Sequence, residues 1–525
     1  MKRYLTILLT LAMALSLFAP LAGQAEALAP IKFSMSAIDA ETTGVSAITG
    51  EPTPVYEWLK SKYNVDFEFW PLTWSNYVDQ TRMWLASGSA PDIIFLDVAA
   101  VRYSEYVDWV DAELFRPYDL DQYPNLSANF DKMKLGTGAK FAIDDKLYAW
   151  PAIYDSAAFN FVAVPHYEYR VDWAKQTDLY KEDGTYTWEE WWALVKAVQE
   201  LNPAESDETI GVIFRDAWAF PRQILRQYTK DAMAMTLDEN GDYVWGMTLD
   251  STKEGVKAVK QLYDDGLIWK DQVLAIPNSW SDNFYANKLF AVGTENLTYG
   301  GPRGAGTGYI NANPGTTYEN FVDVLAIATV ESPVKGHLLA TVEGDQWSQT
   351  AMNAATVTDE KAARWQSILD YLVSDEGYYT RNWGIPGVEW QYNANGEPEV
   401  IWGTNAEGAL ENPTNGFWWF ARIGGTNDNL ALYAPDGTKW IQKATIDAMN
   451  KYLVEPNEIV PIDVALRFYV DPVYSEITAG LEETIYQKFC ELLPRADFQA
   501  QWDAWVEQEA AILQPAVDAL NANLK

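Results

Sequence analysis

The chain has 525 residues, more than one ordinary hydrophobic core can hold, so we predict two or three domains. Hydrophobic residues make up 48% and charged residues 21%, which is typical of a folded protein and argues against disorder. A formal net charge of -36 gives a surface that repels nucleic acid and anionic membranes, so we expect neither as a partner.

The N-terminus has the three parts of a secretory signal peptide. Met1-Lys2-Arg3 carries positive charge, an apolar run covers residues 4–21, and Ala25-Glu26-Ala27 is a small-x-small cleavage pattern. A membrane anchor is the alternative, but Pro20 interrupts a run that is only marginally long enough to span a bilayer. We therefore expect residues 1–27 to be removed and the mature protein to lie outside the cytoplasm.

Cysteine and histidine are too few for several kinds of site. Cys490 is the only cysteine, which excludes an intramolecular disulfide and leaves no residue near the signal peptide to carry a lipid. His166 and His337 lie far apart in the sequence, so we expect no histidine-rich zinc site and no serine or cysteine triad. The excess is aromatic, with Trp 24, Tyr 30 and Phe 20, whose flat apolar faces and polar rims suit sugar rings.

The first part of the chain alternates strand and helix, which favours a parallel or mixed sheet covered by helices. We predict strands at 31–36, 65–69 and 93–96 and helices at 55–63 and 74–85. Gly88 suits the left-handed residue after the second helix. Asp97 follows the third strand, at the sheet edge where open α/β sheets bind ligands. It is therefore either a ligand contact or a cap of the next turn.

The middle of the chain predicts a second α/β part. Thr187 with Glu190 is a capping box, and the helix that follows carries three tryptophans that we expect in the core. The glycine-rich loop 299–308 has no lysine followed by serine or threonine, so it is not a phosphate-binding loop. The remaining elements are a first crossing between parts at 147–164, strands at 209–214 and 287–293, a helix at 253–265, a second crossing at 321–330, a helix at 359–374 and helices after residue 440.

A set of short segments, taken in order, resembles one family. They are Ser87-Gly88-Ser89-Ala90-Pro91-Asp92-Ile93-Ile94, Tyr148-Ala149-Trp150-Pro151, Arg170-Val171-Asp172-Trp173, Thr187-Trp188-Glu189-Glu190-Trp191, Tyr263-Asp264-Asp265-Gly266-Leu267-Ile268, Ser374-Asp375-Glu376-Gly377, Gly384-Ile385-Pro386-Gly387-Val388-Glu389-Trp390 and Gln501-Trp502-Asp503-Ala504-Trp505. Together with the signal peptide, they resemble the bacterial extracellular solute-binding proteins of family 1, which serve carbohydrate ABC importers, in particular the LipO- and AlgQ-like branch.

The resemblance implies a periplasmic-binding-protein-like α/β fold, with two α/β lobes joined by a multi-strand hinge and a ligand cleft between them. We assign residues 28–155 and 320–385 to the first lobe, and 156–319 and 386–525 to the second. It also implies a monomer that binds a carbohydrate, expected to be an oligosaccharide, by hinge closure and delivers it to ABC permease subunits. No catalysis and no cofactor are implied.

The sequence departs from the family pattern at two places. Members from Gram-positive bacteria commonly carry a lipid-modified cysteine after the signal peptide, and this chain has none. Some relatives have a calcium loop where this chain reads Asn202-Pro203-Ala204-Glu205-Ser206-Asp207-Glu208, which lacks the alternating oxygen ligands that calcium prefers. We therefore predict no metal there.

The candidate ligand contacts are chosen for their positions at strand ends, crossings and loops. They are Asp97, Trp150, Tyr154, Asn160, Trp218, Trp280, Trp347, Trp418 and Trp419. Packing explains any single tryptophan about as well as sugar binding does. Arginines suit an anionic uronate, although a structural ion pair is the more common role of any one of them; the candidates are Arg170, Arg215, Arg222 and Arg422.

Two other functions stay open at this point. A secreted glycoside hydrolase would also be acidic and rich in tryptophan, and 74 acidic residues always allow a facing pair of carboxylates. A glycan-binding surface or sensor protein without a transporter is the second alternative.

Overall fold

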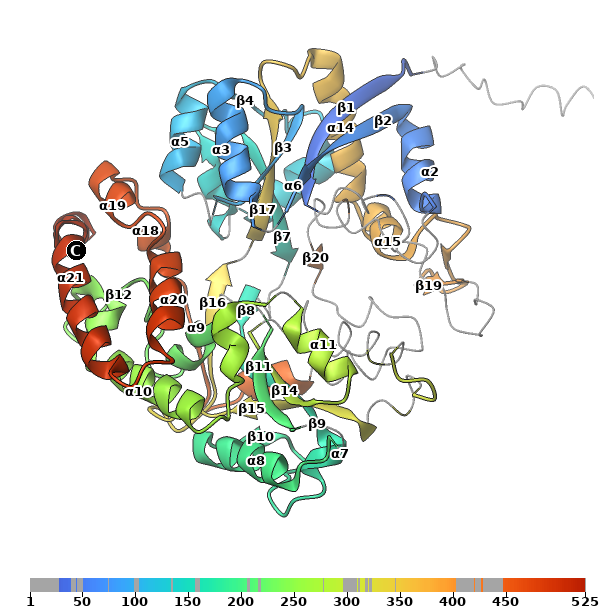
Figure 1. The fold of residues 1–525 in the computed structure, drawn as a ribbon. Helices are drawn as coiled ribbons and strands as arrows, with labels where there is room; N and C mark the ends of the chain where they lie inside the picture. Colours follow the sequence, from blue (N-terminus) through green and yellow to red (C-terminus); the bar gives the residue numbers. More distant parts are fainter. Residues whose placement is uncertain are drawn as a thin grey trace, which may run out of the picture.

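Figure 1 shows the computed structural model of the chain, in which an upper and a lower lobe are joined by a few strands. The structure describes residues 28–524 apart from positions 39–43, 45–50, 74, 99–102, 134–135, 156–160, 205–207, 216–218, 277, 296–308, 310–311, 317–319, 321–322, 345, 403–419, 421–425 and 428–446. The expected signal peptide lies outside these residues.

The first lobe is built on a seven-stranded sheet with helices packed against it. β1 is parallel to its neighbours β2 and β3, whereas β17 is antiparallel to β3 and β7. The strand order is β2 (Val65–Leu72), β1 (Ile31–Ile38), β3 (Ile93–Leu96), β17 (Gln346–Asn353), β7 (Ala149–Asp155) and β20 (Thr426–Asn427), with β4 (Phe115–Arg116) beside β17. The helices are α2 (Pro54–Tyr63), α3 (Tyr77–Ser87), α5 (Tyr103–Asp111), α6 (Pro124–Met133), α14 (Asp359–Leu372) and α15 (Asp375–Trp383).

Local sequence explains the elements around β3. Gly88 ends α3 at a φ of 67°, a left-handed conformation that glycine adopts without steric cost. All four residues of β3 are buried, as the uninterrupted apolar run predicted, because helices cover both faces of this strand. The prediction of a βαβαβ start to the first lobe is confirmed.

The second lobe has a five-stranded sheet and most of the later helices. Its central strand, β9, is antiparallel to both neighbours. The strand order is β10 (Thr185–Tyr186), β15 (Leu325–Val330), β9 (His166–Arg170), β14 (Leu289–Thr294) and β11 (Ile210–Phe214). The helices are α7 (Val171–Ala174), α8 (Trp188–Leu201), α9 (Ala219–Leu225), α10 (Asp250–Asp264), α11 (Ser279–Tyr285), α18 (Val464–Arg467), α19 (Pro472–Ile477), α20 (Leu481–Leu492) and α21 (Phe498–Asn523).

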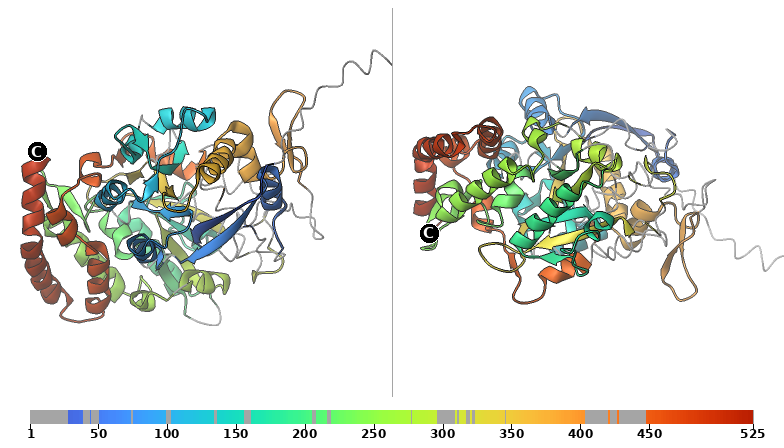
Figure 2. Two further views of the ribbon diagram at one scale, coloured as in Figure 1. Left: turned by 90° about the horizontal axis from the view of Figure 1, so that it is seen from above. Right: turned by 60° about the horizontal axis from the view of Figure 1, so that its bottom comes forward.

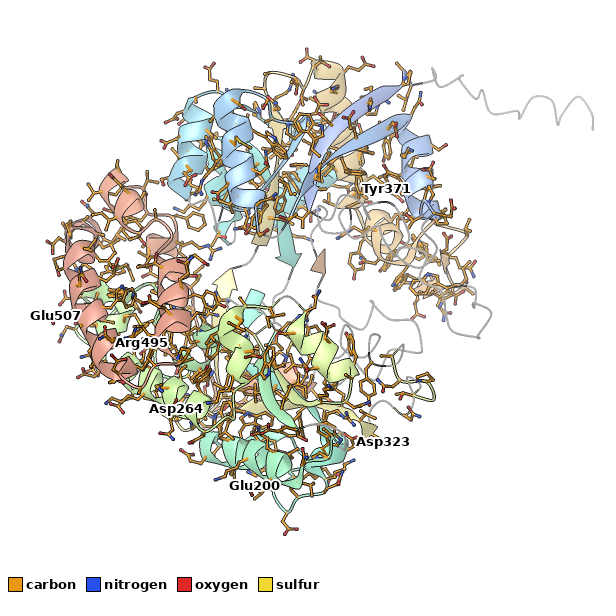
Figure 3. The ribbon with its side chains drawn as sticks, in the orientation of Figure 1. Glu200, Asp264, Asp323, Tyr371, Arg495 and Glu507 are labelled. Atoms are coloured by element: carbon orange, nitrogen blue, oxygen red, sulfur yellow. The ribbon has the colours of Figure 1, made fainter. Side chains whose placement is uncertain are left out.

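Two sequence predictions in this lobe are confirmed. Thr187 and Glu190 form the capping box of α8, in which each side chain accepts a hydrogen bond from the other residue's backbone N–H. Of the three tryptophans expected in the core, Trp191 and Trp192 are buried, whereas Trp188 is half-buried and packs against the edge of the core. The helices α19 to α21 gather on one side of the lobe in every view (Figure 2), and Figure 3 labels Arg495 and Glu507 on that outer side.

The lobes are connected through a small three-stranded sheet of β8 (Phe161–Ala163), β16 (Leu339–Gly344) and β21 (Glu458–Val460). The chain passes between lobes from β7 to β8, back from β16 to β17, and again after β20. The minor hairpins are β5 (Ala142–Ile143) with β6 (Lys146–Leu147), β12 (Met235–Leu237) with β13 (Tyr243–Trp245), and β18 (Trp390–Tyr392) with β19 (Pro398–Val400).

The structure corrects two of the lobe boundaries. Residues 320–344, assigned to the first lobe, contain β15 and β16, which pair with strands of the second lobe and of the connecting sheet. The run 321–330 is therefore a strand of the second lobe, not a crossing. Part of the segment after residue 386, assigned to the second lobe, belongs to the first. The Trp390 ring lies 5.0 Å from that of Tyr379 in α15, at an interplanar angle of 50°, and the Phe420 ring lies 5.1 Å from that of Phe67.

Within the described part of the chain, none of the helices combines the length and the apolar character that a membrane span requires.

Candidate ligand-binding site

The strand directions bring one edge of each sheet to the hinge. In the first lobe, β3 ends at Leu96 beside Gln349, near the start of β17, and β7 ends at Asp155, where the chain leaves the lobe. In the second lobe, β14 ends at Thr294, which pairs with His166 just after the chain has entered. The carboxyl end of β11 lies at the same edge, because β11 runs parallel to β14. Since the crossings leave from these edges, the two edges face each other (Figure 1).

The edge of the first lobe is a buried polar network around Asp97. The hydroxyl of Tyr77 donates to Asp97 Oδ2 at 3.1 Å, and Asp97 is only 6% exposed. The backbone N–H of Val98 donates to Gln349 Oε1 at 2.9 Å, and the Gln349 amide donates in turn to Gln346 Oε1. Burial first, and the Asp97 carboxylate second, raise the pKa of the Tyr77 phenol, so it stays a donor at neutral pH. These contacts hold Asp97 and the glutamines in place.

The edge of the second lobe carries a guanidinium stacked on an indole. Arg215 directly follows β11, and its backbone N–H donates to Gly293 O at 2.9 Å. Its guanidinium carbon lies 5.1 Å from the ring centroid of Trp280, a half-buried residue of α11. The pKa of the neighbouring Tyr285 is raised, mainly by burial. The positive charge of Arg215 partly offsets this rise, and the negative charge of Glu168 adds to it. Arg215, Glu168 and Tyr285 therefore lie in one layer beside the sheet.

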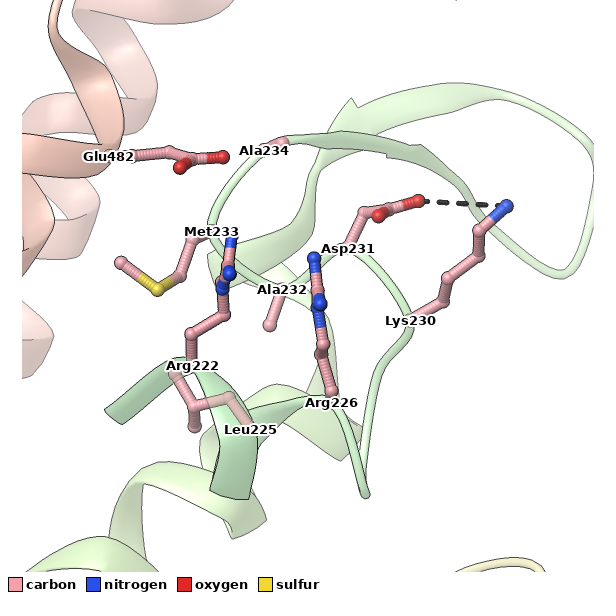
Figure 4. Close-up of a pocket in the computed structure, with 9 residues that line it drawn as sticks. All are labelled: Arg222, Leu225, Arg226, Lys230, Asp231, Ala232, Met233, Ala234 and Glu482. Carbon is pink, nitrogen blue, oxygen red and sulfur yellow. Dashed lines mark ion pairs between the residues drawn. The ribbon is translucent and has the colours of Figure 1, made fainter. Parts of the chain in front are cut away.

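A pocket of the second lobe, open to solvent, lies farther along the chain and is lined by several charged side chains (Figure 4). Arg222 Nη2 and Arg226 Nη1 lie 2.8 Å and 3.2 Å from the same oxygen of Glu295, which is 3% exposed. Lys230 lies 3.8 Å from the carboxylate of Asp231. Because each cation faces a carboxylate, we interpret this pocket as an ion network that holds α9 against the end of β14.

The structure describes the side chains of three of the nine candidate contacts. Asp97 and Trp280 lie at the two facing edges, as their positions after β3 and in α11 show. Trp150 is a correction: its ring is 1% exposed and packs 6.2 Å from Tyr118 in the core of the first lobe. The alternation of β7 directs this residue inward, so it offers no accessible face to a sugar.

The other candidates are described in part or not at all. Tyr154 and Trp347 have described backbones on β7 and β17, close to the crossings, where Trp347 pairs with Ala152. The ladder shifts register between Trp347 and Gln349, with Ser348 at a φ of 55°. The remaining candidates lie outside the described residues: Asn160, Trp218, Trp418, Trp419 and Arg422.

Sequence reasoning missed the partners of Asp97. Tyr77 lies in the helix predicted at 74–85, and nothing in that pattern indicates that its hydroxyl donates to Asp97, 20 residues later. Gln346 and Gln349 lie on β17, after the chain returns from β16, and no local pattern marks Gln349 as a partner of Val98, which lies 251 residues earlier. The pairing of β17 with β3 alone brings them together.

Among the described residues, no three His, Cys, Asp or Glu side chains gather closely enough to hold a metal ion. In the loop that starts at Asn202, the side-chain oxygen of Asn202 accepts from the backbone N–H and the hydroxyl of Thr209, at 2.8 Å and 2.9 Å. Residues 205–207 lie outside the described part, so the absence of calcium at this loop stays a prediction.

Comparison with known proteins identifies the fold. No family model and no curated protein matches the sequence. Among solved structures, the alginate-binding protein AlgQ2 without calcium ion is 18% identical, with 93% of this chain and 98% of that chain covered and a TM-score of 0.62. The Streptococcus pneumoniae ABC-transporter substrate-binding protein FusA, in complex with kestose, is 16% identical, with 94% and 100% covered and a TM-score of 0.62.

A third similar structure is an HMO-binding, ABC-transporter-associated solute-binding protein from Bifidobacterium longum infantis. It is 15% identical, with 94% of this chain and 98% of that chain covered and a TM-score of 0.60. The chain has the fold of these solute-binding proteins. The sequence prediction of a two-lobe, periplasmic-binding-protein-like α/β fold is confirmed. Asp97 and Arg215 lie at the two edges that face each other in this solute-binding fold.

Proposed function

We propose that the protein is the extracytoplasmic substrate-binding protein of an ABC importer and that it binds an oligosaccharide between its lobes. The observation that supports this most directly is the pair of facing sheet edges, with Asp97 and Gln349 on one and Arg215 and Trp280 on the other. The likeness to substrate-binding proteins over 93–94% of the chain supports the same function. A bound sugar would contact both edges and favour the closed arrangement of the lobes.

The expected contacts are sufficient for micromolar affinity. A hydrogen bond to a sugar hydroxyl contributes about 0.5–1.5 kcal/mol net. Several such bonds and one or two stacked rings supply about 8 kcal/mol, which corresponds to micromolar affinity. Besides Asp97 and Trp280, we propose these ligand contacts: Tyr154, Asn160, Trp218, Trp347, Trp418 and Trp419.

The function has consequences for location and partners. The signal peptide exports the chain and is cleaved near Ala27, and the mature monomer has no cysteine at its start for a lipid anchor. The sugar leaves unchanged, because the protein hands it to transmembrane permease subunits without performing a reaction.

A ligand screen on the mature protein tests the proposal. We expect a thermal-shift screen of mono- and oligosaccharides to find at least one sugar that raises the melting temperature. X-ray scattering with that sugar should give a smaller radius of gyration, and product analysis should find the sugar intact. Hydrolysis of an oligosaccharide, or a compactness that no sugar changes, would refute the proposal.

A further inference from the structure

We propose that the ligand carries a carboxylate, as a uronic acid does, and that the guanidinium of Arg215 binds it at the edge of the second lobe. This inference rests on the proposed function and names the chemical class of its ligand.

The structure distinguishes among the four arginines that suit an anionic sugar. Arg170 is occupied, because Nε and Nη2 donate to Asp172 at 2.9 Å and 2.6 Å and Nη1 donates to Asn287 at 2.6 Å. Arg222 is engaged with Glu295, and Arg422 lies outside the described residues. The side chain of Arg215 makes no hydrogen bond and no ion pair with any described residue, and its Nη1 atom is buried.

An arginine without a partner is unexpected in this chain. Acidic residues outnumber basic ones by 74 to 38, so a carboxylate for Arg215 would be easy to supply. Arg215 as a whole is half-exposed, so an anion can reach its guanidinium and supply the acceptor that the side chain lacks. That Arg215 has no hydrogen-bond or ion-pair partner among the described residues therefore points to a ligand that brings the acceptor.

The stacking of Arg215 prepares it for a carboxylate. The guanidinium carbon lies over the Trp280 ring, 5.1 Å from the ring centroid. A stacked guanidinium keeps its N–H groups in one plane, where they can donate two parallel hydrogen bonds to a carboxylate. The same indole offers its apolar surface to the C–H face of the sugar ring that carries the carboxylate.

One carboxylate of the protein shares the layer with Arg215, and its position is compatible with the proposal. Glu168 lies in the middle of β9, between Val292 and Ile327, and is 1% exposed. The Nε2 atom of His166 lies 3.9 Å from Glu168 Oε1. Glu168 weakens the positive potential near Arg215 but makes no ion pair with it, so the guanidinium stays available to a ligand.

Calorimetry with matched sugars tests the inference on the mature protein. The probes are tetramers of mannuronate, guluronate and galacturonate, each beside the same tetramer with its carboxylates reduced to alcohols. We expect the wild type to bind at least one uronate tetramer tenfold or more tighter than its reduced form. Arg215→Gln should raise the Kd for that uronate about 10- to 100-fold and leave the Kd for the reduced sugar unchanged.

Two further variants control for fold and for net charge. Arg495→Gln removes one positive charge from the same lobe at its outer side (Figure 3) and should keep the preference for uronate. Arg215→Lys keeps the charge but loses the planar fork, so we expect an intermediate loss of affinity for the uronate. This variant replaces Arg215→Gln in the experiment if Arg215→Gln does not fold.

The outcomes separate the inference from the proposed function. Binding of a neutral oligosaccharide in preference to every uronate, or an unchanged preference in Arg215→Gln, would refute the inference that Arg215 binds a carboxylate of the ligand. The proposed sugar-binding function would not be affected. Failure of every charged and neutral sugar to bind would overturn both.

Discussion

The two facing edges differ in how their polar groups are satisfied. At the edge of the first lobe, the protein supplies partners for its own polar groups, from Tyr77 to Asp97 and from Val98 to Gln349. At the edge of the second lobe, Arg215 rests on Trp280 and its Nη1 atom has no partner among the described residues. Buried polar groups are nearly always paired in folded proteins. We therefore interpret the first edge as a prearranged support and the second as the part that the proposed ligand would complete.

The largest expected effect is a difference in stability between alanine variants of two candidate tryptophans, Trp150 and Trp280. Trp150→Ala removes a ring that is 1% exposed in the core of the first lobe, and we expect the free energy of unfolding to fall by about 3–5 kcal/mol. Trp280→Ala removes a half-buried ring, so it should cost about 1 kcal/mol and abolish sugar binding instead. Urea denaturation and calorimetry measure the two effects. Equal stability losses would contradict the distinction.

The second effect compares a paired with an unpaired arginine of the second lobe. Arg222→Gln disrupts the contact with Glu295, a carboxylate that is 3% exposed, and should lower the free energy of unfolding by about 2 kcal/mol. Arg226 remains as a second partner of Glu295 and limits the loss. Arg215→Gln should lower the free energy of unfolding by about 1 kcal/mol or less, because the contact with the Trp280 ring is the one described side-chain contact that is lost. A larger loss for Arg215→Gln would show that its guanidinium has a structural partner.

The third effect concerns the support of the first lobe. Tyr77→Phe removes a hydrogen bond to Asp97, which is 6% exposed, and should lower the free energy of unfolding by about 1–2 kcal/mol. Sugar affinity should fall as well, because Asp97 loses one of the contacts that orient it. Tyr123→Phe is the matched control, since its hydroxyl donates to a backbone carbonyl at an exposed site. Equal losses in the two variants would mean that burial at this edge does not matter.

The smallest effect is a pH dependence at a paired site away from both edges. The hydrogen bond from Lys181 and that from the Thr187 backbone lower the pKa of Glu190 below its ordinary value of 4.5. The stabilisation is complete above that pH and is lost as the pH falls through the lowered value. Because the pair is partly exposed, Glu190→Gln should only slightly reduce the decrease in melting temperature between pH 5 and pH 3. An identical decrease in both proteins would contradict this assignment.

Local sequence patterns were sufficient for much of the fold. The strand of β3, the left-handed Gly88 and the capping box of Thr187 and Glu190 each depend on residues a few positions apart. The lobe boundaries were less accurate, because a β-rich run such as 325–330 joins whichever sheet has an open edge. The sequence of such a segment does not indicate which sheet it will join.

The candidate site was only partly predictable. The positions of Asp97 and Trp280 near a strand end and in a loop region placed them at the facing edges, where their contact with a ligand stays a prediction. Trp150 was assigned wrongly, because the direction of a side chain depends on the register of β7. The carboxylate that engages Arg222 comes from Glu295, 73 residues later, so the paired arginines could not be separated from Arg215 without the fold.

The sequence by itself determined the acidic charge, the alternation of strands and helices and the supply of aromatic and arginine residues, and it predicted an export signal. Only the tertiary structure decided which polar groups meet a partner and which stay open at the facing edges. The physical reason is range: helix caps and strand periodicity act over a few residues, while ion pairs and strand pairing join residues that the chain separates by tens to hundreds of positions.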